Sequence, residues 1–92
     1  MIRSFCDRDT ERLWKREHVA RFGAFESVAR RKLVMLNNAR SLGDLRSPPG
    51  NELELLKGDR KGEHSIRINR QYRICFLWRD GDAHEVEITD YH

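Results

Sequence analysis

The chain has 92 residues, of which 38% are hydrophobic, 9% aromatic and 36% charged. A chain of this length forms one small domain, spanning residues 1–92, which excludes a two-lobed enzyme and a long repeat array. Fourteen arginines and four lysines against fifteen acidic residues leave a net charge of +3. Because arginine predominates and its guanidinium forms forked contacts with phosphate, the composition favours an anionic partner.

The sequence carries no signature of a membrane or secreted protein. No apolar run approaches the roughly 20 residues needed to cross a bilayer, and residues 1–14 lack the apolar centre of a secretory signal. Cys6 and Cys75 match no zinc-binding spacing, and the isolated histidines match none either. We therefore expect a soluble, cytoplasmic protein with no membrane partner, no metal and no other cofactor.

The N-terminal third predicts a strand followed by a helix. Residues 1–5 alternate between apolar and polar side chains, which is typical of a short strand. Asp7 or Asp9 is a suitable N-cap for a helix that runs through Leu13 and Trp14.

The next segment predicts the longest helix of the chain, over residues 24–40. Its hydrophobic residues recur at helical spacing, and most of its arginines fall on the other side. Residues 41–45 predict one further short turn. Residues 47–51 contain two prolines and a glycine, and we expect a surface loop there. The hydrophobic helix positions are Phe25, Val28, Ala29, Leu33 and Leu36.

The second half predicts a meander of antiparallel strands over residues 53–56, 65–69, 72–79 and 83–89. The pair Asp80-Gly81 suits a tight hairpin turn between the last two strands. The overall prediction is an α+β fold, with helices packed on one face of the sheet and the other face partly open. We expect function to lie on the open face.

Arg73 is the anomaly of this pattern. Residues 72–78 are apolar on both sides of the alternation, as expected for a central strand that is covered on both faces. A charge there must reach a rim, a partner or a ligand, because burying it unpaired costs several kcal/mol.

Two segments carry residues suited to phosphate or proton chemistry. Lys57–Gly62 is a basic turn flanked by glycines, without the sequence of a phosphate-binding loop, and a solvated surface turn is the alternative reading. The chain ends in Asp90, Tyr91 and His92, which bring together a carboxylate, a phenol and an imidazole. Imidazole titrates near neutral pH and is suited to proton transfer at an RNA hydroxyl, although a terminal histidine is also commonly frayed.

Taken together, four stretches resemble the HigB branch of the RelE/ParE toxin superfamily. The length, the order of elements and the proline-glycine loop agree with that family, and the resemblance covers nearly the whole chain. The stretches are Leu55–Gly62, His64–Asn69, Tyr72–Ile74 and Asp90–His92.

The resemblance implies a RelE-like fold, with a mixed, mainly antiparallel sheet of four to five strands and two to three N-terminal helices on one face. It implies a toxin of a type II toxin-antitoxin system that enters the A site of the 30S ribosomal subunit and cuts mRNA there. Cleavage in this branch needs no metal and uses the ribose 2′-hydroxyl as nucleophile. The implied partner is a HigA-like helix-turn-helix antitoxin, and operator DNA is bound only through the antitoxin complex.

The resemblance also assigns catalytic roles to five positions of this chain: Lys57, Arg73, Asp90, Tyr91 and His92. Lys57 and Arg73 are suited to stabilising charge on phosphoryl oxygens, and His92 is the candidate proton carrier. Tyr91 would stack on a base or position the 2′-hydroxyl, and Asp90 would orient His92 or raise its basicity.

Four further cations are candidate RNA contacts: Arg60, Lys61, Arg67 and Arg70. Whether Arg67 shares a face of the sheet with Arg73 depends on the register of the turn over residues 69–71, which the sequence leaves open.

The sequence departs from relatives at two positions. Some relatives carry a histidine just before the lysine, where this chain has Leu53-Glu54-Leu55, so acid-base work at that place falls to Glu54 or disappears. Many relatives place Trp before the conserved arginine, where Tyr72 stands here.

Two alternatives remain open at this stage. Fold does not fix function, so a ParE-like toxin that inhibits DNA gyrase without cutting RNA is one. An inactive relative that is retained for its antitoxin-bound, operator-binding complex is the other.

Overall fold

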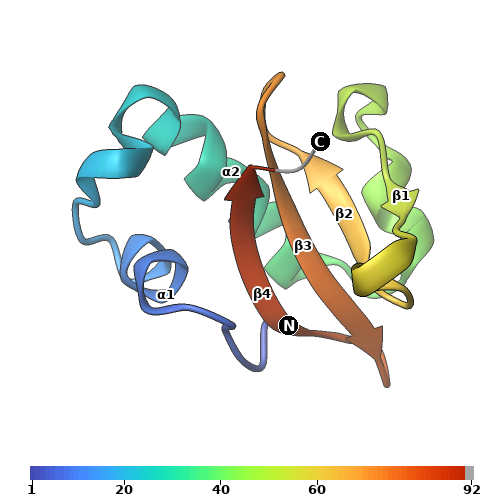
Figure 1. The fold of residues 1–92 in the computed structure, drawn as a ribbon. Coiled ribbons are helices and arrows are strands. Elements are labelled where there is room, and N and C mark those ends of the chain that lie inside the picture. Colours follow the sequence, from blue (N-terminus) through green and yellow to red (C-terminus); the bar gives the residue numbers. More distant parts are fainter. Residues whose placement is uncertain (91–92) are drawn as a thin grey trace.

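The computed structural model describes residues 1–90 and shows an α+β fold, which confirms the predicted class (Figure 1). In chain order, the elements are α1 (Arg8–Trp14), η1 (Ala20–Phe25), α2 (Glu26–Asn38), η2 (Leu42–Arg46), η3 (Pro49–Asn51), β1 (Glu54–Leu55), η4 (Gly58–Arg60), β2 (His64–Arg67), β3 (Tyr72–Arg79) and β4 (Asp82–Asp90). Short 3-10 helices lie between the two α-helices, between α2 and β1, and between β1 and β2.

Within residues 1–90 the sheet has four strands in the order β1-β2-β3-β4, and each neighbouring pair is antiparallel. β3 is therefore flanked on both sides, as its sequence predicts. Asp80 and Gly81 have φ angles of 53° and 78°, so the β3–β4 hairpin has the predicted primed turn. The strand expected over residues 53–56 is shorter than predicted, because only Glu54–Leu55 pairs with β2 in a regular ladder.

The predicted N-terminal strand is wrong in its extent. Among the described residues, Ile2 and Phe5 form isolated parallel bridges with Ala83 and Val86 of β4. Between these bridges Glu85 adopts a φ of 52° and its backbone N–H binds the Ser4 hydroxyl. The irregular backbone of β4 therefore interrupts the ladder that a full strand would need.

The first helix begins where the sequence predicts. The Asp7 carboxylate accepts a hydrogen bond from the backbone N–H of Thr10 at 3.1 Å, which satisfies one of the free donors of α1. The second helix begins at Glu26, two residues later than predicted, because Ala20–Phe25 form a 3-10 helix that buries Phe22 and Phe25.

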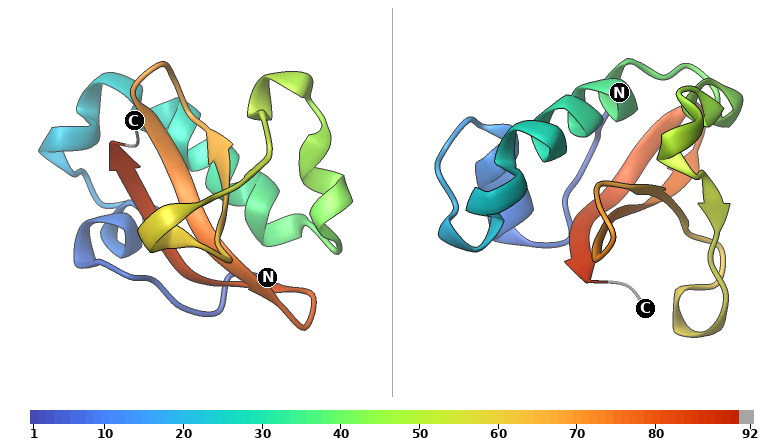
Figure 2. Two further views of the ribbon diagram at one scale, coloured as in Figure 1. Left: turned by 45° about the vertical axis from the view of Figure 1, so that its right-hand side comes forward. Right: turned by 90° about the horizontal axis from the view of Figure 1, so that it is seen from above.

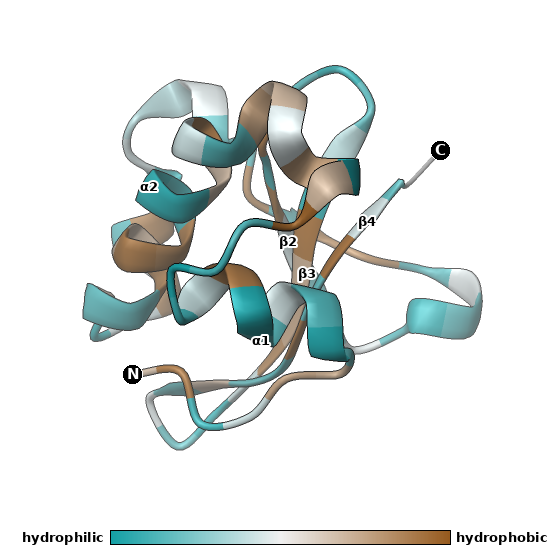
Figure 3. Ribbon diagram, turned by 90° about the vertical axis from the view of Figure 1, so that its left-hand side faces the viewer, coloured by the Kyte–Doolittle hydropathy of each residue, from teal (hydrophilic) through white to brown (hydrophobic). Residues whose placement is uncertain are grey.

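The hydrophobic core lies between the helices and one face of the sheet. Leu33 and Leu36 of α2 belong to the same buried cluster as Ile74 and Phe76 of β3. Figure 3 shows both helices lying over the strands, with hydrophobic stretches of β3 and β4 behind them. Among the residues described, no helix is long and apolar enough to span a membrane.

The proline-rich segment is not the plain surface loop that the sequence predicts. Pro49–Asn51 forms one 3-10 turn, and Asn51 is fully buried. Its side-chain amide donates to the carbonyls of Leu45 and Ser47 at 3.1 and 3.2 Å, and its oxygen accepts from the Lys32 ammonium. Burial and, second, the charge of Arg31 lower the pKa of Lys32. A polar network therefore fixes this turn against α2.

We expect Asn51→Ala to lower the free energy of unfolding by about 2 to 3 kcal/mol, because Lys32 and two carbonyls lose their buried partner. The matched control is Asn38→Ala, at the exposed end of α2, which should change stability by less than about 0.5 kcal/mol. Urea denaturation measures both. Equal effects of the two substitutions would contradict the role given to Asn51.

Candidate nucleic-acid interface

The face of the sheet turned away from the helices carries the polar residues of the strands. Successive residues of a strand point to opposite faces of the sheet. The residues that flank a buried core residue along its strand therefore point away from the helices. We call this the open face and define it by six residues. They are Ser65 and Arg67 of β2, Arg73 and Cys75 of β3, and Glu87 and Thr89 of β4.

Arg73 lies on the open face near the start of β3 and is well packed, with 12% of its side chain exposed. Its Nε–H donates to the Ser65 hydroxyl at 2.7 Å, and its Nη2 donates to the backbone carbonyl of Glu52. The carboxylate of Glu54 lies 3.9 Å from Nη2. The anomalous charge on the central strand is therefore held by polar partners from two other segments.

Arg67 shares this face, which answers the question of register. Arg67 and Arg73 are direct cross-strand partners, and such partners project to the same side of the sheet. Like charges placed opposite each other repel, and two carboxylates offset the repulsion. Glu52 binds Arg67 at 2.8 Å, and Glu54 approaches Arg73. About half of each acidic side chain is exposed, so both carboxylates are accessible to displacement by another anion.

The turn that follows β1 reaches over the opposite half of the open face. Arg60 of η4 donates to Glu87 of β4 at 2.9 Å and to Glu63 at 3.3 Å. Seen from above, α2 lies on one side of the sheet and the η4 turn lies toward the other (Figure 2). Lys57 immediately precedes this turn and is exposed.

Cys75 is buried beneath this arrangement. Burial raises the pKa of its thiol to about 11, against a smaller opposing effect of Arg60. Cys6 is exposed, although partial burial and, second, Glu87 also raise its pKa. Cys6 is therefore open to solvent, whereas Cys75 is shielded from it.

We expect a thiol reagent such as dithionitrobenzoate to label one cysteine per folded chain at pH 8 and two after unfolding. Exposed Cys6 reacts, whereas Cys75 is both inaccessible and protonated. Cys6→Ser is the control and should leave no rapidly reacting thiol. Rapid labelling of native Cys6→Ser protein would show that Cys75 is open to solvent.

Of the other predicted residues, Asp90 ends β4 opposite Tyr72 and accepts a hydrogen bond from the Gln71 amide at 2.9 Å. Asp90 therefore shares a face of the sheet with Tyr72, whereas Arg73 and Thr89 share the opposite face. Lys61 and Arg70 are exposed, in the η4 turn and in the β2–β3 turn respectively. Tyr91 and His92 lie outside the described residues.

Two residues that bind the arginines are not among those predicted from the sequence. Glu52 contributes its carboxylate to Arg67 and its carbonyl to Arg73, and Ser65 contributes a buried hydroxyl. Ser65 could have been found once the β2–β3 register was known, because it sits diagonally across from Arg73. Glu52 has a positive φ of 44° in the turn after η3, and no sequence pattern placed it there.

His64 lies on the helix side of the sheet and stacks against Phe76, with ring centroids 6.2 Å apart. Its Nδ1 is buried without a hydrogen-bond partner, and burial lowers its pKa below the ordinary 6.5. Among residues 1–90, no group of three or more histidine, cysteine, aspartate or glutamate side chains is placed to hold a metal ion.

The lowered pKa of His64 predicts a pH effect on stability. Between pH 6.5 and the lower pKa of the folded state, the unfolded chain binds the proton and the folded chain does not. Stability from this residue is therefore present above pH 6.5 and falls as the pH drops through that window. We expect His64→Phe, which keeps the stacking, to lose less stability than the parent between pH 7 and pH 5 in urea titrations. Parallel curves would contradict this.

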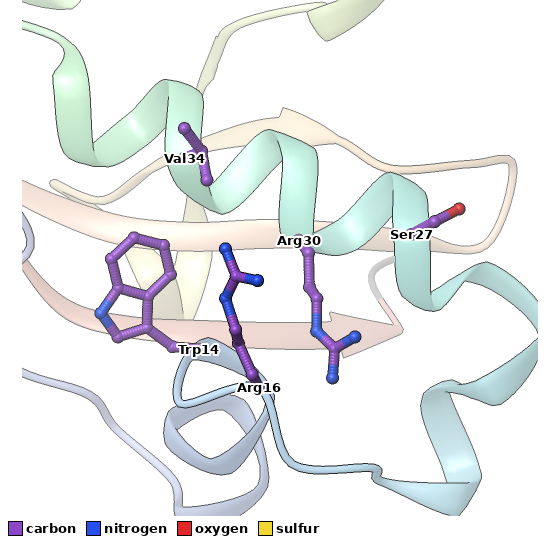
Figure 4. A pocket seen from close by; sticks show the side chains of 5 residues that line it. All are labelled: Trp14, Arg16, Ser27, Arg30 and Val34. Atoms are coloured by element: carbon purple, nitrogen blue, oxygen red, sulfur yellow. The ribbon is translucent and has the colours of Figure 1, made fainter.

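A pocket of about 420 Å³ lies between the helices, on the other side of the sheet from Arg73. Figure 4 shows Arg16 extending from the turn after α1 towards α2, between Trp14 and Arg30. Ser27 and Val34 of α2 complete its lining. Of the predicted catalytic and RNA-binding residues that lie within residues 1–90, none contributes to its lining.

Comparisons with known proteins place these features in a family. The family model described as the RelE-like toxin of type II toxin-antitoxin system HigB matches residues 3–92. The chain belongs to the HigB-like toxin family. It is 41% identical over 85 residues to Toxin HigB-1 of Vibrio cholerae serotype O1, a match that covers 90% of each chain. It is 36% identical over 61 residues to Endoribonuclease HigB of Proteus vulgaris, covering 66% of this chain and 65% of the relative.

Solved structures confirm the RelE-like fold. The toxin chain of a YoeB-YefM complex from Staphylococcus aureus superimposes with a TM-score of 0.58 at 18% identity, covering all of this chain and 98% of the other. At this identity the likeness establishes the fold. The predicted family and fold class are therefore both confirmed.

Proposed function

We propose that this HigB-like toxin is an endoribonuclease that cuts mRNA in the ribosomal A site and that RNA lies on the open face near Arg67 and Arg73. The observation that carries the proposal is the pair of arginines that face each other on adjacent strands. Each arginine lies next to an exposed carboxylate. The name of the Proteus vulgaris relative, an endoribonuclease, supports the activity.

The reaction needs charge stabilisation and proton transfer. The ribose 2′-oxygen attacks the adjacent phosphorus, the bond from phosphorus to the 5′-oxygen breaks, and a cyclic phosphate and a 5′-hydroxyl result. Negative charge builds on the non-bridging oxygens during this step. The guanidinium of Arg73 stabilises that charge through paired N–H donors, and Lys57, exposed just before η4, adds a point charge.

The proton steps fall to the C-terminal residues in this proposal. His92 takes the proton of the 2′-hydroxyl or supplies one to the leaving oxygen, because imidazole changes charge near neutral pH. Tyr91 stacks on a base or positions the 2′-hydroxyl, and Asp90 orients His92. Thr89 lies directly opposite Arg73, so β4 passes beside Arg73 one residue before Asp90.

The remaining cations extend the RNA contact. Lys61 and Arg70 are exposed and attract the backbone electrostatically, whereas Arg60 first has to exchange its ion pairs with Glu63 and Glu87. Glu54 occupies the place where some relatives carry a histidine, and in this proposal it is a carboxylate that RNA displaces from Arg73.

The proposed partner is an antitoxin of the HigA-like helix-turn-helix type, and operator DNA is bound through that complex. The structural neighbours are toxins in complex with an antitoxin, YefM, which supports the existence of such a partner. A substrate on the ribosome places the protein in the cytoplasm.

We expect Arg73→Ala to lower the rate of mRNA cleavage in a reconstituted translation system by about 100-fold or more, because it removes preorganised charge stabilisation. The matched control is Arg79→Ala, on the same strand roughly 20 Å away at an exposed position, which should stay within about threefold of the parent. Mapping of RNA 5′ ends, phased with the reading frame, measures cleavage.

Two results would contradict the proposal. One is an unchanged cleavage map with Arg73→Ala at full rate. The other is absence of RNA cleavage by the parent protein together with inhibition of DNA gyrase in a supercoiling assay, which would favour the non-nuclease alternative.

A further inference from the structure

The contact between Ser65 and Arg73 is the most buried polar contact of the open face. Ser65 has no exposed surface, and its Oγ accepts the Nε–H of Arg73 at 2.7 Å. The two residues lie diagonally across the β2–β3 ladder, because Ser65 pairs directly with Cys75. This spacing brings a short side chain on one strand within reach of a long side chain on the next.

The contact determines which edge of the guanidinium faces the protein. The Nε–H and one N–H of Nη2 form one edge of the planar group, and these donate to Ser65 and to the carbonyl of Glu52. The end edge, formed by Nη1 and Nη2, keeps donors for a ligand. Among residues 1–90, no acceptor is hydrogen-bonded to Nη1, and the nearby Glu54 carboxylate lies 3.9 Å from Nη2.

We propose that Ser65 is a positioning residue, which fixes the guanidinium of Arg73 so that its end edge meets a phosphate of the RNA. The inference rests on the proposed function and names a residue that works through Arg73 without touching the substrate. A forked contact needs both donors in one plane with the phosphate oxygens, so rotation about the last side-chain bonds would lose one of the two. The Ser65 hydroxyl and the Glu52 carbonyl prevent that rotation.

The position of Ser65 in the fold supports this role. A buried serine on a strand lacks the apolar contacts of its neighbours Ile66 and Ile74, and its hydroxyl needs a partner once water is excluded. Arg73 is that partner. A preorganised donor is worth more to catalysis than a mobile one, because it does not have to be ordered when the charge develops.

The test is a pair of substitutions with opposite expected outcomes. Ser65→Ala should lower kcat for ribosome-dependent cleavage by about tenfold while KM changes by less than about twofold, since the loss falls on the transition state. Ser65→Thr keeps an acceptor at the same place and should recover most of the rate. Thermal denaturation of both variants shows whether the fold is retained.

Repeating the Ser65→Ala substitution in an Arg73→Lys protein distinguishes a positioning role of Ser65 from a general effect on packing. Lysine has no Nε–H fork, so in an Arg73→Lys protein the additional Ser65→Ala change should cost less than about twofold. The Arg73 Nε–H resonance of the folded toxin gives an independent readout. We expect slow exchange with water in the parent and in Ser65→Thr, and fast exchange in Ser65→Ala.

The outcomes are distinct. Unchanged kcat with Ser65→Ala, or an equal loss from Ser65→Ala in the parent and in the Arg73→Lys background, would overturn the positioning role. Full activity of Arg73→Ala would instead overturn the proposed site, and the exchange measurement would still report whether Ser65 orders the guanidinium.

Discussion

The constraint on which the open face depends is the placement of a positive charge on the central strand. The three residues that follow Arg73 on β3 are Ile74, Cys75 and Phe76, and all three are fully buried. An unpaired cation at this place would cost free energy of folding. The fold meets this constraint with a hydroxyl from β2, a carbonyl from the turn before β1 and a nearby carboxylate. The two-residue β1 strand and the turns around it are thus organised around one guanidinium.

The same groups create a surface whose charge is balanced at rest. Glu52 and Glu54 neutralise two facing arginines, and Arg60 is paired with Glu63 and Glu87 across the sheet. The carboxylates near Arg67 and Arg73 are more exposed than the arginines, and in the proposed function a phosphate backbone displaces them. These contacts set three arginines against four glutamates, so binding of an anion at this face requires displacement of the acids.

Local signals predicted the elements well, and long-range geometry accounts for what they missed. The cap at Asp7, the helix of residues 26–38 and the primed turn at Asp80-Gly81 each follow from short-range rules. Burial of Asn51 depends on its contact with Lys32, which is 19 positions away, and the contact of Ser65 with Arg73 depends on the β2–β3 register, which the sequence leaves open. The N-terminal strand is shorter than predicted where β4 has a positive φ angle at Glu85. The family was predicted from combined motifs and is confirmed, whereas the catalytic roles remain predictions, and two of the residues, Tyr91 and His92, lie outside the described part of the chain.

The most direct measurement is photocrosslinking of the toxin to an mRNA that carries 4-thiouridine in the A-site codon and a 2′-O-methyl group at the scissile position. The toxin would be bound to programmed ribosomes, irradiated and digested, and the crosslinked peptides identified by mass spectrometry. If RNA lies on the open face, crosslinks form in the segment that contains β2 and β3 and at the end of β4. Crosslinks confined to α1 and α2, around the pocket of Trp14 and Arg16, would place RNA on the other side of the sheet and contradict this placement.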